Sequence, residues 1–242
     1  RPMKSKRLHD HIYLKENRYK KTKEMFKFID KHAFKINQRN YKEEVCDIGC
    51  AAGEFLYFLK GKYPSKFFTG ADVRQDLLTK AKRIVKNVNF KKGSVLKKNL
   101  FKKSKFDKIF MVGVHPIFDN FEGCFSNLIF WGKPRAEIFI CDMFNPYPVD
   151  VLIRYKLSEN YKSKTYETGW NIFSEKSVTK FLKNNKKVKS FHFKRFQMPF
   201  DLKPQKDPIR SWTIKSNNKR LMINGISIIQ PQTLIKIKLK DF

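Results

Sequence analysis

Two aspartates and two glycines near the start of the chain have the types and spacing of a nucleotide-binding site. Asp47 lies in an apolar run that ends at Gly49, and Gly53 follows after three small residues. Glycine allows the backbone to approach a ligand closely. Nineteen positions after Gly53, a second strand-like run ends at Asp72. An acidic residue at about this distance accepts hydrogen bonds from ribose hydroxyls in doubly wound α/β proteins, so the pattern predicts a nucleotide-like ligand.

Regular strand and helix patterns surround these residues. The apolar run before Gly49 predicts a buried strand, and the next residues predict a helix. Ser174 is a predicted N-cap because its hydroxyl can accept a hydrogen bond from a free amide of the first helical turn. Further strands are predicted over 67–73, 87–94, 106–114 and 136–144, and further helices over 75–86, 121–131 and 175–184. This alternation predicts an α/β fold with a largely parallel sheet.

The glycine loop differs from the dinucleotide fingerprint, because it lacks Gly-x-Gly and is preceded by an aspartate. Asp-x-Gly-x-x-x-Gly from Asp47 to Gly53, with Asp72 ending the next strand, resembles motifs I and II of the class I, Rossmann-like S-adenosylmethionine-dependent methyltransferases. The resemblance implies a doubly wound, mostly parallel seven-stranded sheet with helices on both faces. It also implies a C-terminal antiparallel hairpin, from strands over 188–200 and 221–239. A generic α/β domain, whose glycines serve only packing, is the alternative.

The same resemblance implies S-adenosylmethionine as the cofactor and assigns residues to it. Asp72 would meet the ribose hydroxyls. Val73 and Ser94 would lie near adenine, where family members often carry an acidic residue in place of the neutral Ser94. Residues Val112 to His115, with Val114 among them, would line the floor opposite the methionine moiety. The methionine and ribose end would contact the loop residues Asp47, Gly49, Cys50, Ala51 and Gly53.

Residues that bind the methyl acceptor or remove its proton are expected beyond the carboxyl ends of the strands, where open α/β sheets place their active sites. His115 follows the strand over 106–114, and because imidazole titrates near neutral pH it is the candidate general base. The alternative is a packing histidine. No metal is expected, since the adjacent Asp-Asn pair typical of metal-assisted relatives is absent. Candidate acceptor-binding residues are Tyr147, Arg154, Trp170 and Arg210.

The chain divides by composition into two parts. Residues 1–40 form a basic extension, in which a helix over 14–33 is expected to pack across the mouth of the cofactor site, with simple packing against the domain as the alternative. Residues 41–242 form the methyltransferase-like domain. A polar insertion over about 145–171 interrupts its alternation of strands and helices and is expected to face the substrate.

Composition limits the cellular setting and the partners. Fifty-three Lys and Arg against 22 Asp and Glu give a net charge of +31, which permits RNA binding. Most of the cations are lysine, however, and arginine is the residue suited to bidentate contacts. No apolar stretch is long enough to span a membrane. Four cysteines without a metal-type or paired spacing predict reduced thiols and a cytoplasmic location.

Methyl transfer from a sulfonium requires positioning of the acceptor and removal of its proton, without a dedicated nucleophile. We therefore expect a methyltransferase acting on a small polar metabolite or on a sugar or glycoconjugate precursor, at oxygen. One alternative is an RNA methyltransferase that uses the lysine-rich surface. A second is a non-catalytic scaffold that only binds the cofactor.

Overall fold

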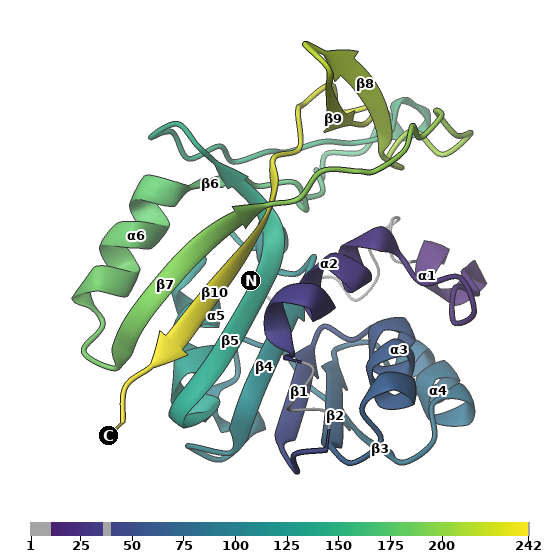
Figure 1. Cartoon of the computed structure of the whole chain (residues 1–242). Coiled ribbons are helices and arrows are strands. Elements are labelled where there is room, and N and C mark those ends of the chain that lie inside the picture. Colours follow the sequence, from purple (N-terminus) through teal and green to yellow (C-terminus); the bar gives the residue numbers. More distant parts are fainter. Residues whose placement is uncertain (1–10, 36–39, 242) are drawn as a thin grey trace.

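A central sheet carries the fold, with its strands in the order β3-β2-β1-β4-β5-β10-β7 (Figure 1). The computed structural model describes residues 11–35 and 40–241. The first five strands of this order are parallel, whereas β10 runs antiparallel to both β5 and β7. This confirms the predicted seven-stranded, mostly parallel sheet. The strands are β1 (Glu44–Ile48), β2 (Phe67–Asp72), β3 (Val88–Lys92), β4 (Phe106–Val112), β5 (Gly132–Asn145), β7 (Val188–Arg195) and β10 (Gln232–Leu239).

Helices cover both faces of the sheet, which explains why the central strands are apolar on both sides. In β4, Ile109 and Met111 pack into the cluster formed with α5 and α6. The residue between them, Phe110, packs into the opposite cluster with α2 and α3. The helices are α2 (Glu24–Ala33), α3 (Glu54–Lys62), α4 (Gln75–Ile84), α5 (Glu122–Trp131) and α6 (Glu175–Asn184), with short helices α1 (His11–Lys15), η3 (Lys98–Leu100), η4 (His115–Ile117) and η5 (Ser158–Asn160).

The start of α6 was predicted correctly, together with its cap. Ser174 Oγ accepts a hydrogen bond from Ser177 N at 3.0 Å, so it satisfies one free amide of the first turn. The short strand β6 (Phe173–Ser174) lies immediately before the helix and pairs with the end of β5. None of the helices in the described part of the chain has the length and apolarity that a membrane crossing requires.

The predicted helix over 14–33 is wrong in its middle. The structure has α1 and α2, and the residues between them are not helical. Tertiary contacts account for the break: Tyr19 Oη donates to Ala52 O at 2.7 Å, and Arg18 N donates to Glu54 Oε1 at 2.9 Å. Residues 1–10 and 36–39 of the predicted extension lie outside the described residues.

The predicted strand over 221–239 is also two elements. Its first part is β9 (Lys219–Ile223), which pairs with β8 (Trp212–Ser216) in a hairpin separate from the main sheet. Asn217 and Asn218 connect the two strands with φ angles of 46° and 61°. Positive φ at both central residues is the requirement of a two-residue hairpin turn, and asparagine tolerates it. In Figure 1 this hairpin stands apart from the main sheet, beyond the upper ends of its strands.

Candidate active site

A cavity of about 500 Å³ opens at the carboxyl ends of β1, β2 and β4. This is the edge at which open α/β sheets bind their ligands. Eight of the nine predicted cofactor residues line it: Asp47, Gly49, Cys50, Ala51, Asp72, Val73, Ser94 and Val114. The ninth, Gly53, caps α3 with a φ angle of 79°, and a Cβ there would approach Ala81 Cβ to 3.2 Å. Gly53 therefore serves the turn into the helix rather than the lining.

Gly49 lets the loop after β1 fit closely against the end of β4. Its φ angle is +75°, and a Cβ at this position would lie only 2.3 Å from Val114 Cγ2. The amides of Gly49 and Cys50 both donate to Ala71 O, at 2.7 and 3.0 Å. These two bonds attach the loop to β2, so the small residues of the loop form one wall of the cavity.

Asp72 ends β2 and holds two loops in place. Its Oδ2 accepts a hydrogen bond from Ala51 N at 2.9 Å, and its Oδ1 accepts one from Arg74 N at 2.8 Å. Each carboxylate oxygen can accept more than one hydrogen bond. Asp72 can therefore position the loop after β1 and still receive donors from a ligand, as a ribose diol requires.

Asp47 is the second carboxylate of the cavity, and only 3% of its surface is exposed. Burial, together with the nearby charge of Asp72, raises the pKa of Asp47 well above its usual range. Within residues 11–35 and 40–241, no donor forms a hydrogen bond with its side chain. A cationic or hydrogen-bond-donating ligand would relieve this unfavourable burial.

The N-terminal segment forms the roof of the cavity. Tyr13, Lys23, Met25 and Phe26 all line it, in agreement with the expectation that this segment crosses the cofactor mouth. Lys23 Nζ lies 3.1 Å from carboxylate oxygens of both Glu16 and Glu54. These ion pairs attach the roof to the first turn of α3.

Arg210 belongs to this roof rather than to the cavity lining. Its Nη1 lies 2.6 Å from Glu16 Oε1, and Glu16 is nearly buried. Burial alone would raise the pKa of Glu16, but Lys23 and Arg210 lower it overall. Arg210 therefore connects the segment before β8 to the roof, across 194 positions of sequence.

The structure places His115 behind the cavity wall. Its side chain is 0% exposed and stacks on Phe144 with ring centroids 4.6 Å apart. Its Nδ1 lies 3.1 Å from Asp142 Oδ2, but without the geometry of a hydrogen bond, and His115 does not line the cavity. In this arrangement the imidazole cannot reach an acceptor. Among the described residues, no group of three His, Cys, Asp or Glu side chains converges as a metal site would require.

The other predicted acceptor residues also lie away from the lining. Tyr147 is 72% exposed, and Arg154 Nη2 lies 2.6 Å from Asp119 Oδ2 on the surface. Trp170 is not among the lining residues either. The part of the insertion that reaches the cavity wall is its end, at Asn171.

Asn171 was not predicted, and it is 0% exposed. Its Nδ2 donates to Phe118 O at 2.9 Å, and its Oδ1 accepts from Ile153 N at 2.7 Å. Its backbone amide donates to Pro116 O at 3.1 Å. Ile117 and Phe118 line the cavity, so Asn171 holds this wall against the insertion. No local pattern distinguishes Asn171 from other loop asparagines.

Other lining residues also escaped prediction. Arg74 directly follows the predicted strand over 67–73. Its place next to Asp72 and Val73 therefore indicates a position in the cavity lining. The roof segment was expected at the mouth of the site, but which of its residues line the cavity depends on contacts distant in sequence. The remaining lining residues not predicted are Ile48, Ala52, Glu54, Phe55, Leu77, Gly93, Val95, Ile117 and Phe118.

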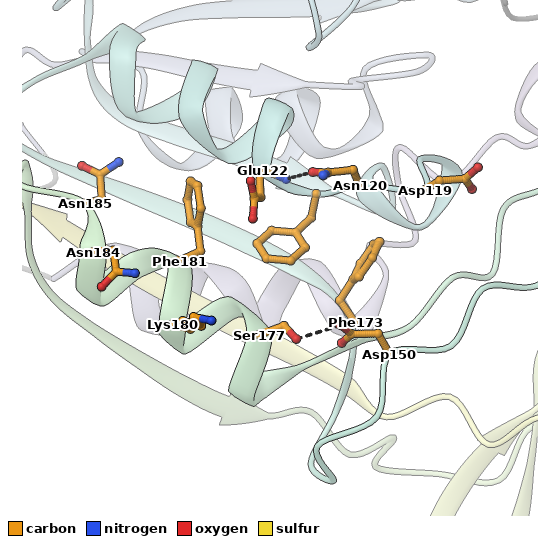
Figure 2. A pocket seen from close by; sticks show the side chains of 11 residues that line it. Asp119, Asn120, Glu122, Asp150, Phe173, Ser177, Lys180, Phe181, Asn184 and Asn185 are labelled. Atoms are coloured by element: carbon orange, nitrogen blue, oxygen red, sulfur yellow. Dashed lines mark hydrogen bonds between the residues drawn. The ribbon is translucent and has the colours of Figure 1, made fainter.

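A second cavity of about 500 Å³ lies between α5 and α6 (Figure 2). Phe121, Phe173 and Phe181 form its apolar part, and carboxylates stand at its rim. Two of these carboxylates already have partners. Asp150 accepts from Ser177 Oγ at 2.7 Å, and Asp119 pairs with Arg154. Asp150 therefore stabilises the start of α6, and Asp119 stabilises the insertion.

Comparisons with known proteins agree with this geometry. Residues 39–195 match the family described as "Methyltransferase domain". The fold resembles that of a SAM-dependent methyltransferase from Archaeoglobus fulgidus, with 16% identity over 95% of this chain and 100% of that chain and a TM-score of 0.57. It also resembles the YcgJ protein from Bacillus subtilis, with 12% identity over 90% of this chain and 99% of that chain and a TM-score of 0.58.

A third similar structure is a SAM-dependent methyltransferase from Methanosarcina mazei, with 14% identity over 86% of this chain and 98% of that chain and a TM-score of 0.55. No curated protein sequence matches the chain. The solved structures show the class I methyltransferase fold, and the family match spans well over half of the chain. The chain therefore belongs to the methyltransferase domain family.

Proposed function

We propose that the protein transfers a methyl group from S-adenosylmethionine to a small polar acceptor. The observation that carries the proposal is the convergence of Asp47, Asp72 and the glycine loop on one cavity. The cofactor supplies an activated methyl group on a sulfonium. The protein must bind the cofactor and the acceptor, orient them toward each other and exclude water from the site.

The cavity residues fit such a cofactor. Each carboxylate oxygen of Asp72 can accept more than one hydrogen bond, as ribose hydroxyls require, and Val73 and Ser94 line the cavity where the base would lie. The buried Asp47 carboxylate suits the cationic methionine end, because an opposite charge offsets the cost of burying its own.

The roof over the cavity favours a small acceptor over a bulky one. Tyr13, Lys23 and Phe26 cover the cavity, so an acceptor must be narrow enough to pass beneath them. We place the transfer at oxygen, in a metabolite or in a sugar or glycoconjugate precursor. Cysteine-based carbon methylation is disfavoured, since burial raises the pKa of the Cys50 thiol well above its usual range.

Two motifs bear on the acceptor atom. His115-Pro116-Ile117-Phe118 follows β4, where amino-directed methylases of the same fold carry an Asn-Pro-Pro-Tyr-type motif. This difference argues against amino-group methylation. Removal of the acceptor proton can then fall to solvent or to a cavity residue, since His115 is enclosed behind the wall.

The experiment that tests the proposal uses methyl-tritiated S-adenosylmethionine with host-cell extract. We expect label in the small-molecule or sugar-nucleotide fraction. Label in nuclease-sensitive polymer would identify an RNA methyltransferase instead. Cofactor binding without label in any fraction would favour the scaffold alternative. The Gly49→Val variant is the control, since its added side chain clashes with Val114 and should abolish labelling.

The wall held by Asn171 leads to a prediction about turnover. Asn171→Ala removes the bonds to Phe118 and Ile153, each worth about 1 kcal/mol, and frees the cavity wall. We expect turnover to fall by about tenfold or more while cofactor affinity changes little, since small misplacements are costly in catalysis. Steady-state kinetics and calorimetry measure the two quantities. Asn160→Ala, at an exposed position of the same insertion, should alter neither.

The ion pair that holds the roof leads to a prediction about the rate at which the cofactor dissociates. Arg210→Met removes the ion pair to Glu16, a partly buried pair worth about 1 kcal/mol, so the roof should open more often. We expect cofactor to dissociate about fivefold faster, as measured by stopped-flow displacement. Arg220→Met removes an exposed pair with Asp201 and is the matched control. Equal dissociation rates in both variants would mean that Arg210 does not hold the roof.

A further inference from the structure

Four lysine-rich segments meet at the end of the sheet opposite the cavity. They are residues 97–107, 133–135, 183–189 and 238–241. Backbone hydrogen bonds connect three of them directly: Lys240 N donates to Lys187 O at 2.8 Å, and Arg135 N donates to Lys240 O at 2.9 Å. The segment 97–107 joins them where Phe106 pairs with Gly132 at the start of β5. The four segments thus form one continuous surface, here called the basal surface.

The basal surface has a large excess of positive charge. Its segments hold thirteen lysine or arginine residues and two aspartates. Both aspartates are engaged: Asp107 pairs with Lys133, and Asp241 with Arg135. Like charges are close enough to interact, since the pKa of Lys187 is lowered by burial and then by the charges of Lys103 and Lys98.

Exposed lysines of this surface include four that are suitable for substitution. Lys102, Lys103, Lys183 and Lys186 form no ion pair with any described residue. Lys23, which lines the cavity, forms ion pairs with both Glu16 and Glu54. The four segments carry a net charge of +11 in 25 residues, against +20 in the other 217 residues, so the excess charge of the chain is concentrated on them.

We propose that the basal surface binds the phosphate backbone of RNA. Lysine neutralises phosphates as a point charge, which is enough for binding without sequence preference. Every large apolar side chain in the four segments is buried, so the surface lacks the apolar residues that insert into a membrane interface. A protein partner is also less suitable, because protein interfaces are depleted in lysine and depend on apolar and aromatic anchors.

RNA bound here is a docking partner and not the methyl acceptor. The basal surface lies at the amino end of β4, and the cavity lies at its carboxyl end. A strand of seven residues separates them by about 20 Å. The inference is independent of the acceptor proposed above.

Two charge-matched variants test the proposal. The basal variant carries Lys102→Gln, Lys103→Gln, Lys183→Gln and Lys186→Gln. The control variant carries Lys162→Gln, Lys164→Gln, Lys203→Gln and Lys206→Gln, at exposed positions of the insertion and of the segment before β8. Binding of a fluorescein-labelled RNA duplex is measured by anisotropy across a series of salt concentrations.

We expect the basal variant to bind RNA at least about tenfold more weakly at low salt. The slope of log affinity against log salt should decrease by about 3 to 4, close to one for each lysine removed. The control variant should bind like the original protein. Equal losses in both variants, or no loss in the basal variant, would overturn the proposal. So would binding to phosphatidylserine vesicles without binding to RNA. Cofactor affinity, measured in parallel, should stay unchanged, which separates this test from that of the methyltransferase.

Discussion

Replacing Asp72 with alanine is expected to weaken binding of S-adenosylmethionine by about 10- to 100-fold. Hydrogen bonds to a charged group contribute about 1.5–3 kcal/mol, and each 1.4 kcal/mol corresponds to a factor of ten in affinity. Asp72→Ala also removes the acceptors for Ala51 N and Arg74 N, so the glycine loop loses a support as well. Isothermal titration calorimetry measures the effect.

A second substitution at this position separates the charge from the geometry. Asp72→Asn keeps one oxygen acceptor and removes the charge, so its affinity should fall between that of the original protein and that of Asp72→Ala. Asp241→Ala, at the far end of the sheet, should leave the affinity unchanged. If Asp72→Ala folds normally and still binds the cofactor tightly, the assignment of Asp72 to the ribose is wrong.

Replacing Asp47 with asparagine is expected to stabilise the free protein and to weaken cofactor binding. The buried carboxylate has no hydrogen-bond donor among the described residues and faces the charge of Asp72, so it opposes folding when ionised. Asparagine has a similar shape and no charge. We expect a higher unfolding free energy at neutral pH, on the order of 1 kcal/mol, and an affinity at least about tenfold lower.

The stability gain of Asp47→Asn should depend on pH in a defined direction. The folded protein holds the proton of Asp47 more tightly than the unfolded chain, because the folded pKa is raised. Between the unfolded and folded pKa values, the folded state therefore binds more protons, and stability falls as pH rises. The difference between variant and original should be absent below the ordinary carboxyl range. It should grow as pH rises toward the folded pKa and stay constant above it.

Urea unfolding at a series of pH values measures this difference. Asp201→Asn is the matched control, because its pKa is lowered by Arg220 and Lys215 and it lies on the surface. That substitution should not increase stability at neutral pH. A constant gain for Asp47→Asn at every pH would show that the charge of Asp47 is not the cause.

Short-range patterns were sufficient to predict the cofactor wall. Gly49 and Asp47 lie within three positions of each other, and Asp72 ends the neighbouring strand, so local geometry and parallel pairing bring them together. The same holds for the Ser174 cap of α6, which depends on a residue only three positions away. Local interactions of this kind depend on residue type and spacing alone.

Contacts between residues distant in sequence decided the features that local patterns did not predict. The break between α1 and α2 depends on Tyr19 meeting Ala52, and Arg210 reaches the roof instead of the substrate because Glu16 is its partner. The separate hairpin of β8 and β9, in contrast, has a local signal in the sequence, because Asn217-Asn218 suits a two-residue turn.

His115 shows the same division between local pattern and tertiary structure. The sequence by itself determined that it follows β4 at the active edge of the sheet. The tertiary structure decided which way its ring points, because Phe144 and Phe173 from other elements enclose it. The orientation of a side chain depends on packing partners distant in sequence, and no spacing rule within one strand specifies them.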